Sequence, residues 1–208
     1  MQLLDCFVTK TRQISNVSLS GILTGSMRTE AATLAGGCFW CTEAIFNRLK
    51  GVMSVTPGYT GGTLPNPSYE QVSTGTTGHA EAIQIEFDTA KISFDKLLDV
   101  FWVTHNPSTL NQQGADIGTQ YRSIIFYHSD EQKKKAQDSK EKIEREKLYN
   151  NPIATEILPF RKFYKAENYH KDYYENNQNA PYCLLVIDPK IQKLLKEFAK
   201  DVKDKYIS

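Results

Sequence analysis

The sequence predicts a single α+β domain, built as a two-layer sandwich of helices on a sheet. Three observations support this fold class. The chain has 208 residues, a length typical of one domain. Its composition is 40% hydrophobic and 24% charged, which suits a globular core that needs no disulfide staples. Strand-like and helix-like patterns then alternate along the chain, without an internal repeat.

The charge and cysteine content exclude several classes of protein. Lys and Arg number 25 and Asp and Glu number 24, so the net charge of +1 lacks the basic footprint of a nucleic-acid-binding domain. No apolar stretch approaches the length of a membrane-spanning helix. Four cysteines are too few for a disulfide-dense scaffold in a chain of this length. They leave redox catalysis or one metal site open.

Residues 1–29 differ in composition from the rest of the chain. They are basic and rich in hydroxyl side chains, with Asp5 as the acid, and they lack the apolar run of a secretory signal. This composition resembles an organelle transit peptide, but we interpret the segment as a poorly packed extension before a domain at 30–208. Cytoplasmic localisation is expected, because free reactive thiols need a reducing supply.

The first half of the domain alternates between strands and helices. The apolar segment 31–35 predicts a strand, which Gly36-Gly37 ends. Ile45, Phe46 and Leu49 lie at helical spacing and predict a helix over 39–50. Val52–Tyr59 predicts a strand, and 61–78 predicts a long loop rich in Gly, Pro, Ser and Thr.

The second half continues the same alternation. Ile83, Ile85 and Phe87 alternate with polar residues, as in a half-buried strand. Ser93 can cap a helix that ends before Asn106-Pro107. The remaining expected elements are a central strand at Tyr121–Tyr127, a solvated helix at Asp130–Lys147 and a last helix that begins at Asp188-Pro189.

The most informative stretch places a cysteine at the start of a helix. Cys38 follows Gly36-Gly37 and opens the predicted helix, whose N-terminal amides favour a thiolate. A thiolate is the reactive form of cysteine, so Cys38 is positioned as a nucleophile. A buried, inert cysteine is the plain structural interpretation.

Cys38 and Cys41 also form a Cys-x-x-Cys pair, which other chemistries use. A zinc site needs two more ligands, and the remaining cysteines and histidines are isolated in the sequence. A thioredoxin-like dithiol or a metal-binding redox module based on Cys38 and Cys41 stays an alternative function. A binding module without a reactive cysteine is a third. Phe39 and Trp40, between the cysteines, suggest an apolar wall beside the sulfur, or plain core packing.

Polar residues of three later segments complete the candidate site. Glu81 precedes the half-buried strand, where partial burial raises the pKa of a carboxyl and suits it to general acid work. Tyr69 lies in the long loop, Asp116 lies before the expected central strand, and Tyr121 begins that strand. Exposed turn positions and core packing explain these three residues equally simply.

Five ordered motifs resemble the A-type peptide methionine sulfoxide reductase family. They are Gly-Cys-Phe-Trp-Cys, Gly-Tyr-Thr-Gly-Gly, Asn-Pro-Ser-Tyr, Gly-His-Ala-Glu and Gly-Thr-Gln-Tyr-Arg-Ser. The resemblance covers roughly residues 31 to 188 and implies a ferredoxin-like α+β sandwich. It implies thiol-dependent reduction of methionine-S-sulfoxide, protein-bound or free, through a cysteine sulfenic acid and then a disulfide.

The resemblance also implies a role for each matching residue. Cys38 would be the nucleophile and Glu81 the proton donor. Tyr69 and Tyr121 would bind the sulfoxide oxygen, Asp116 would support the polar side, and Phe39 and Trp40 would hold the S-methyl group. Ala115 replaces an Asn that often precedes this aspartate in the family.

Two cysteines are candidates for the resolving thiol that attacks the sulfenic acid. Cys41 is one helical turn from Cys38, where many members of the family have Gly, and we favour it. Cys183 falls roughly where other members carry a resolving cysteine, but the apolar residues after it, 184–187, look ordered. Thioredoxin or dithiothreitol would reduce the disulfide. No metal or organic cofactor, no nucleic acid and no membrane is expected, and the chain is expected to be a monomer.

Overall fold

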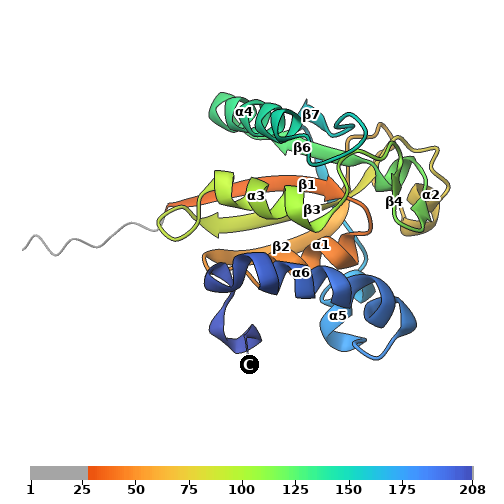
Figure 1. Cartoon of the computed structure of the whole chain (residues 1–208). Helices are drawn as coiled ribbons and strands as arrows, with labels where there is room; N and C mark the ends of the chain where they lie inside the picture. Colours follow the sequence, from red (N-terminus) through yellow and green to blue (C-terminus); the bar gives the residue numbers. More distant parts are fainter. Residues whose placement is uncertain (1–27, 208) are drawn as a thin grey trace, which may run out of the picture.

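A computed structural model describes residues 28–207, and a six-stranded sheet forms its centre (Figure 1). The strand order is β7-β6-β1-β3-β2-β8, and all neighbours are antiparallel except the parallel pair β6 and β7. The strands are β1 Thr29–Gly36, β2 Val52–Thr60, β3 Ala80–Asp88, β6 Ser123–Tyr127, β7 Glu156–Pro159 and β8 Phe163–Lys165. A separate pair joins β4 Gln112–Gln113 to β5 Asp116–Ile117.

The helices gather over one face of this sheet. Helix α1 packs on β2 and β3, α3 lies between α4 and α6, and α4 packs on β6 and β7 (Figure 1). The helices are α1 Phe39–Asn47, α2 Tyr69–Ser73, α3 Phe94–Thr104, α4 Asp130–Glu146, α5 Tyr173–Asn176 and α6 Asp188–Phe198. A π-helical turn, η3 Cys183–Ile187, leads directly into α6. The predicted α+β class is confirmed.

The main core lies between the helices and one face of the sheet. Leu34 of β1 and Ile83 and Ile85 of β3 point into it and are fully buried, as the alternation of apolar residues predicts. Phe101 and Trp102 of α3 fill the helical side of the same core. This layer fixes the height of α1 above the sheet, and α1 carries the candidate cysteines.

The opposite face is covered by the chain itself, because the sheet curls. Strands β7 and β8 lie at opposite edges, yet residues 160–162 alone join them. Leu158, Phe160 and Phe163 of this crossing pack against a second apolar cluster that includes Ala82 and Phe126. The crossing therefore brings β8, and the residues that follow it, to the end of the sheet where β2 finishes.

Several elements differ from the sequence prediction. The loop 61–78 contains the short helix α2, which a capping box at Ser68 stabilises. Strand β6 begins at Ser123 because residues 119–121 form a 3₁₀ turn that leaves Tyr121 at the strand entrance. Neither β7 nor β8 was predicted, since strands this short carry little periodicity.

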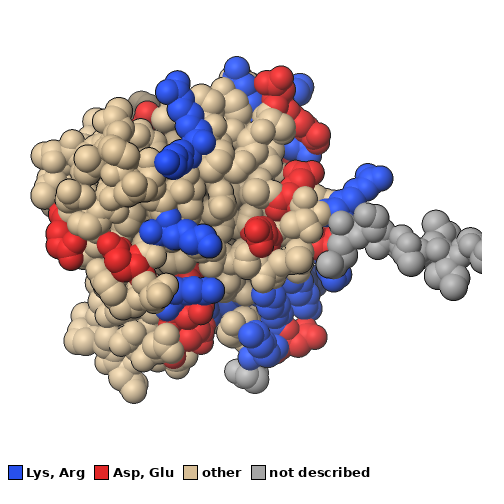
Figure 2. Space-filling view, turned by 180° about the vertical axis from the view of Figure 1, so that it is seen from behind, with Lys and Arg blue, Asp and Glu red and all other residues tan. Residues whose placement is uncertain are grey.

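The first strand begins almost at the first described residue. Of the predicted extension, residues 1–27 lie outside the described residues, and Thr29 already belongs to β1. Within residues 28–207, no helix is both long and apolar enough to cross a membrane. Basic and acidic side chains are interspersed over a largely uncharged face, which agrees with the near-zero net charge (Figure 2).

Replacing Gly58 should test how tightly β2 and β8 must approach. A Cβ atom there would collide with the backbone oxygen of Tyr164, so Gly58→Ala must push β8 outward. Overpacking of this kind costs about 1–3 kcal/mol, which lowers the unfolding midpoint by roughly 2–4 °C per kcal/mol in a protein of this size. Thermal unfolding followed by circular dichroism measures the change. An unchanged midpoint would show that β8 can move away from β2 without loss of stability.

Candidate active site

A tight turn delivers Cys38 from the sheet to the start of α1. Strand β1 ends at Gly36, and Gly37 adopts a positive φ of 87°, where a Cβ would lie 2.6 Å from the side chain of Gln113. Cys38 is the residue that precedes the first turn of α1, and its side chain is 7% exposed. The nucleophile candidate thus lies where the sequence predicts, at a helix start.

Glu81 lies directly beside this helix start. It is 2% exposed in β3, and its Oε2 accepts a hydrogen bond of 3.0 Å from the backbone N–H of Phe39. Burial raises the pKa of Glu81 to about 8, although the hydrogen bond from Phe39 opposes the rise. The carboxyl is therefore largely protonated at neutral pH and has a proton to donate.

Burial opposes the thiolate form that the helix start favours at Cys38. Burial raises the pKa of Cys38 well above that of a free cysteine, and a hydrogen bond with Cys41 and the nearby Glu81 charge add to the rise. Desolvation outweighs the favourable helix amides, because the thiol is almost out of contact with water. Cys38 therefore rests as a thiol.

Cys41 and Asp116 are connected through a residue that sequence reasoning missed. The hydroxyl of Tyr182 donates a 2.8 Å hydrogen bond to Asp116 Oδ2 and lies 3.8 Å from Cys41 Sγ. The hydrogen bond from Cys38 lowers the pKa of Cys41 to about 7, and the positive charge of Lys190 contributes. The second cysteine therefore favours the thiolate more than the first.

Trp40 is held by two aromatic residues of the chain that follows β8. Its indole Nε1–H donates to His170 Nδ1 at 3.1 Å, and its ring stacks on Tyr173 with a centroid distance of 3.6 Å and an angle of 6°. Phe39 is 1% exposed and packs on Tyr59 and His170. Trp40 therefore offers the accessible ring, and Phe39 supports it from the core.

Tyr69 and Tyr121 complete the polar side of the site. Burial raises the pKa of both phenols, and the charge of Glu81 raises them further. Tyr69 opens α2, where its backbone N–H donates to Glu167 Oε1 at 2.9 Å. Glu167 Oε2 also accepts from the hydroxyl of Tyr59 at 2.8 Å. The structure thus gathers all the predicted residues at one end of the sheet.

Cys183 is buried in a helical segment, unlike a cysteine on a loose tail. It is 0% exposed in η3 and belongs to one buried cluster with Cys38, Cys41 and Ile187. Burial raises its pKa. Cys6, the fourth cysteine, lies outside the described residues.

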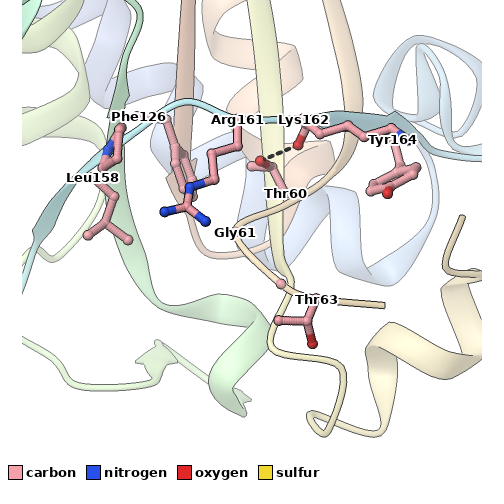
Figure 3. A pocket seen from close by; sticks show the side chains of 10 residues that line it. Thr60, Gly61, Thr63, Phe126, Leu158, Arg161, Lys162 and Tyr164 are labelled. Atoms are coloured by element: carbon pink, nitrogen blue, oxygen red, sulfur yellow. Dashed lines mark hydrogen bonds between the residues drawn. The ribbon is translucent and has the colours of Figure 1, made fainter. Parts of the chain in front are cut away.

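The described part of the chain holds no cluster of three or more metal-ligating side chains. A hollow of about 250 Å³ lies elsewhere, where residues 158–164 cross the sheet (Figure 3). Thr60, Phe126, Leu158 and Arg161 line it, and none of the predicted site residues does.

The sequence matches a known family along most of its length. The model of peptide methionine sulfoxide reductase covers residues 30–203. The chain belongs to the peptide methionine sulfoxide reductase family. A reductase named MsrA from Sulfolobus acidocaldarius is 56% identical over 169 residues, covering 81% of this chain and 95% of that protein. An MsrA of Thermus thermophilus is 53% identical over 174 residues, covering 83% and 97%.

Two solved structures share the fold. The reduced form of Mxr1 from Saccharomyces cerevisiae has a TM-score of 0.68 and 36% identity, covering 75% of this chain and 90% of that one. Methionine sulfoxide reductase A of Corynebacterium diphtheriae has a TM-score of 0.67 and 32% identity, covering 78% and 82%. This chain is an enzyme that reduces methionine sulfoxide with thiols, so the dithiol and metal-binding alternatives are set aside.

Sequence reasoning missed five residues around this reductase site. They are Tyr59, Glu167, His170, Tyr173 and Tyr182. Aromatic residues are dense between 163 and 182, and that density is the signal available in the sequence. It does not reveal which rings contact Trp40, because α5 and η3 pack onto α1 only in the folded chain.

Removing the charge of Glu81 should lower the pKa of Cys38. Glu81 ionises near pH 8, so it is already a carboxylate when the more basic Cys38 thiol loses its proton. Glu81→Gln removes that negative charge and makes the thiolate easier to form. Alkylation of Cys38 as a function of pH, followed by mass spectrometry, gives the midpoint. Glu141→Gln, on the exposed face of α4, is the control, and equal midpoints in all three proteins would contradict the electrostatic coupling.

Proposed function

We propose that Cys38 attacks the sulfur of methionine-S-sulfoxide, free or protein-bound, while Glu81 protonates the sulfoxide oxygen. The observation that carries this assignment is the buried Glu81, whose pKa is about 8 and which is bonded to the amide next to Cys38. The oxygen is a poor leaving group until it is protonated. A carboxyl that keeps its proton at neutral pH meets this need.

The atoms and electrons of this first step balance within the site. The Cys38 thiol and the sulfoxide give a Cys38 sulfenic acid and methionine. Attack by the Cys38 sulfur forms a sulfur–sulfur bond, and the sulfoxide oxygen leaves as water with the protons of Cys38 and Glu81. Water then adds to the Cys38 sulfur and returns a proton to Glu81, and the sulfur–sulfur bond breaks to release methionine. The thiol is thereby oxidised by two electrons and the sulfoxide is reduced by two. Tyr69 and Tyr121 keep their protons, since their pKa values are raised, and as neutral phenols they donate hydrogen bonds to the oxygen.

Trp40 provides the wall for the methyl group, with Phe39 behind it. The indole is fixed by its hydrogen bond to His170 and its stacking on Tyr173, so it forms a rigid apolar surface. Asp116 acts indirectly, since it accepts a hydrogen bond from the Tyr182 hydroxyl and so orients that phenol against Cys41. A wall on one side and proton donors on the other allow the site to discriminate between the two epimers at sulfur. That the S epimer is the one selected is what the resemblance to the A-type family implies.

Cys41 is the resolving thiol in this proposal. It lies one turn from Cys38 at the start of α1, and both side chains belong to the same buried cluster, which supports direct disulfide formation with loss of water from the sulfenic acid. Its lower pKa provides the thiolate that this attack needs. Cys183 belongs to the same buried cluster, but it sits in η3, continuous with α6, so its backbone is held in a helical turn.

A dithiol protein of the thioredoxin type would then reduce the disulfide, with dithiothreitol as its laboratory substitute. The reaction leaves a disulfide, and its reduction to two thiols takes two electrons. No metal or organic cofactor enters any step. The order β6-β1-β3-β2 supports describing the central four strands as ferredoxin-like. The monomeric state, the cytoplasmic location and the domain boundary at residue 30 stay predictions.

Turnover of the two epimers tests the proposed activity. With dithiothreitol, the protein should consume methionine-S-sulfoxide and leave the R epimer, as measured by chiral chromatography. Cys38→Ser should remove all but a trace of the activity while its circular dichroism stays that of the wild type. Equal consumption of both epimers would contradict the proposed selection, and an active Cys38→Ser would exclude Cys38 as the nucleophile.

Glu81→Gln should slow the chemical step strongly. A positioned general acid contributes about 10²–10⁴-fold, and Gln keeps the shape and the acceptor for Phe39 but has no acidic proton. A single turnover, mixed rapidly and quenched with acid, isolates this step from disulfide reduction. A loss smaller than about tenfold would leave Glu81 without the role of proton donor.

The position of the first disulfide tests the resolving cysteine. One equivalent of substrate without reductant should give a Cys38–Cys41 disulfide in the wild type and in Cys183→Ser, as mapped by peptide mass spectrometry. Cys41→Ser should accumulate the sulfenic acid, trapped with dimedone. A Cys38–Cys183 disulfide in the wild type, together with full recycling of Cys41→Ser by thioredoxin, would reverse the assignment.

A further inference from the structure

Glu43 is a buried carboxyl that the proposed reaction does not use. It lies on α1 and its side chain is 1% exposed. Burying a carboxyl costs free energy unless hydrogen bonds compensate. Both of its oxygens accept from one backbone N–H, that of Asp172, at 3.0 Å each. The carboxyl of Glu43 therefore fixes the position of the backbone at Asp172.

That point is a strained turn in the chain that follows β8. Asp172 adopts a positive φ of 53°, a conformation that residues other than glycine rarely adopt. Its side chain accepts a weak hydrogen bond from Asn47 of α1 at 3.4 Å. Lys171 and Asp172 are the residues between His170 and Tyr173, so Glu43 fixes the link between these two rings.

Both rings hold Trp40. His170 accepts the indole N–H, and Tyr173 stacks on the indole face. Trp40 and Glu43 are three residues apart on α1 and therefore share one side of that helix. A turn that is shifted at Asp172 would move a hydrogen-bond acceptor and a stacking partner of Trp40 together.

We propose that Glu43 is a positioning residue for substrate binding. It locks the Lys171–Asp172 turn, so that His170 and Tyr173 hold the Trp40 indole in the orientation that receives the methyl group. The inference rests on the proposed role of Trp40 as the methyl wall. Loss of Glu43 weakens substrate binding without touching Cys38 or Glu81.

The remaining contacts of α5 make this role testable. Arg48, which directly follows α1, forms a 3.0 Å ion pair with Glu175 and lies 4.9 Å from the ring centre of Tyr174. These contacts keep α5 on α1 when Glu43 is replaced. A Glu43 variant should therefore fold and loosen the turn locally.

The experiment compares Glu43→Ala, Glu43→Gln, Tyr173→Leu and the double variant Glu43→Ala with Tyr173→Leu. Steady-state turnover of a peptide that contains methionine sulfoxide, with dithiothreitol as reductant, gives KM and kcat. Glu43→Ala should raise KM about tenfold with kcat within about threefold, as expected when uniform binding is lost. Glu43→Gln, which keeps one acceptor for Asp172, should recover most of the loss. The double variant should be no worse than Tyr173→Leu, because both changes act on one unit.

Fluorescence reports the position of Trp40 directly. The chain has two tryptophans, so Trp102→Phe leaves Trp40 as the single indole. In that background, Glu43→Ala should increase quenching of Trp40 by acrylamide, and Glu141→Ala, on the exposed side of α4, should not.

Three results would overturn the inference. They are a folded Glu43→Ala with wild-type KM and quenching, a Glu43→Gln as impaired as Glu43→Ala, and losses that multiply in the double variant. If Glu43→Ala does not fold, Glu43→Asp, which withdraws the carboxyl by one methylene, has the same expectations as Glu43→Ala. Absence of turnover in the wild type would instead contradict the proposed function, so the two failures are distinct.

Discussion

The hydrogen bond between the Phe39 amide and Glu81 joins the two halves of the chemistry. It ties the start of α1 to β3 at 3.0 Å, so the thiol and the acid keep a fixed relation. The same contact places Glu81 where water is excluded, and that burial keeps its proton at neutral pH. The same contact and burial thus fix the position of Glu81 and keep it protonated. A carboxyl free to turn toward solvent would lose both its fixed position and its proton.

Burial acts in opposite senses on the reactivity of the two groups. It makes Glu81 a better acid for neutral pH, and it makes the Cys38 thiol harder to ionise. Burial therefore favours the protonated form of both the Cys38 thiol and the Glu81 carboxyl. A protonated thiol is protected from unselective oxidation. In our proposal the sulfoxide takes up the Glu81 proton, so the site becomes reactive when substrate enters.

The aromatic residues around Trp40 show how short elements contribute to precision. Helices α2 and α5 are too short to be stable alone, and a carboxylate bonds a backbone amide at or just before the start of each. Glu167 comes from the segment after β8, and Glu43 comes from α1. These longer-range bonds let one-turn helices present Tyr69 and Tyr173 in fixed positions.

The sequence alone determined the α+β class, the helix that opens at Cys38 and the family of the enzyme, because each rests on local pattern or contiguous motifs. Glu81 was also recognisable, because it lies in the Gly-His-Ala-Glu motif that matches the family. Tertiary structure decided the ionisation of Cys38, since desolvation depends on what packs over the thiol. It likewise decided the roles of Tyr182, His170 and Glu43. Their partners are distant in sequence, and the curled sheet and the chain after β8 bring them together, which no local pattern encodes.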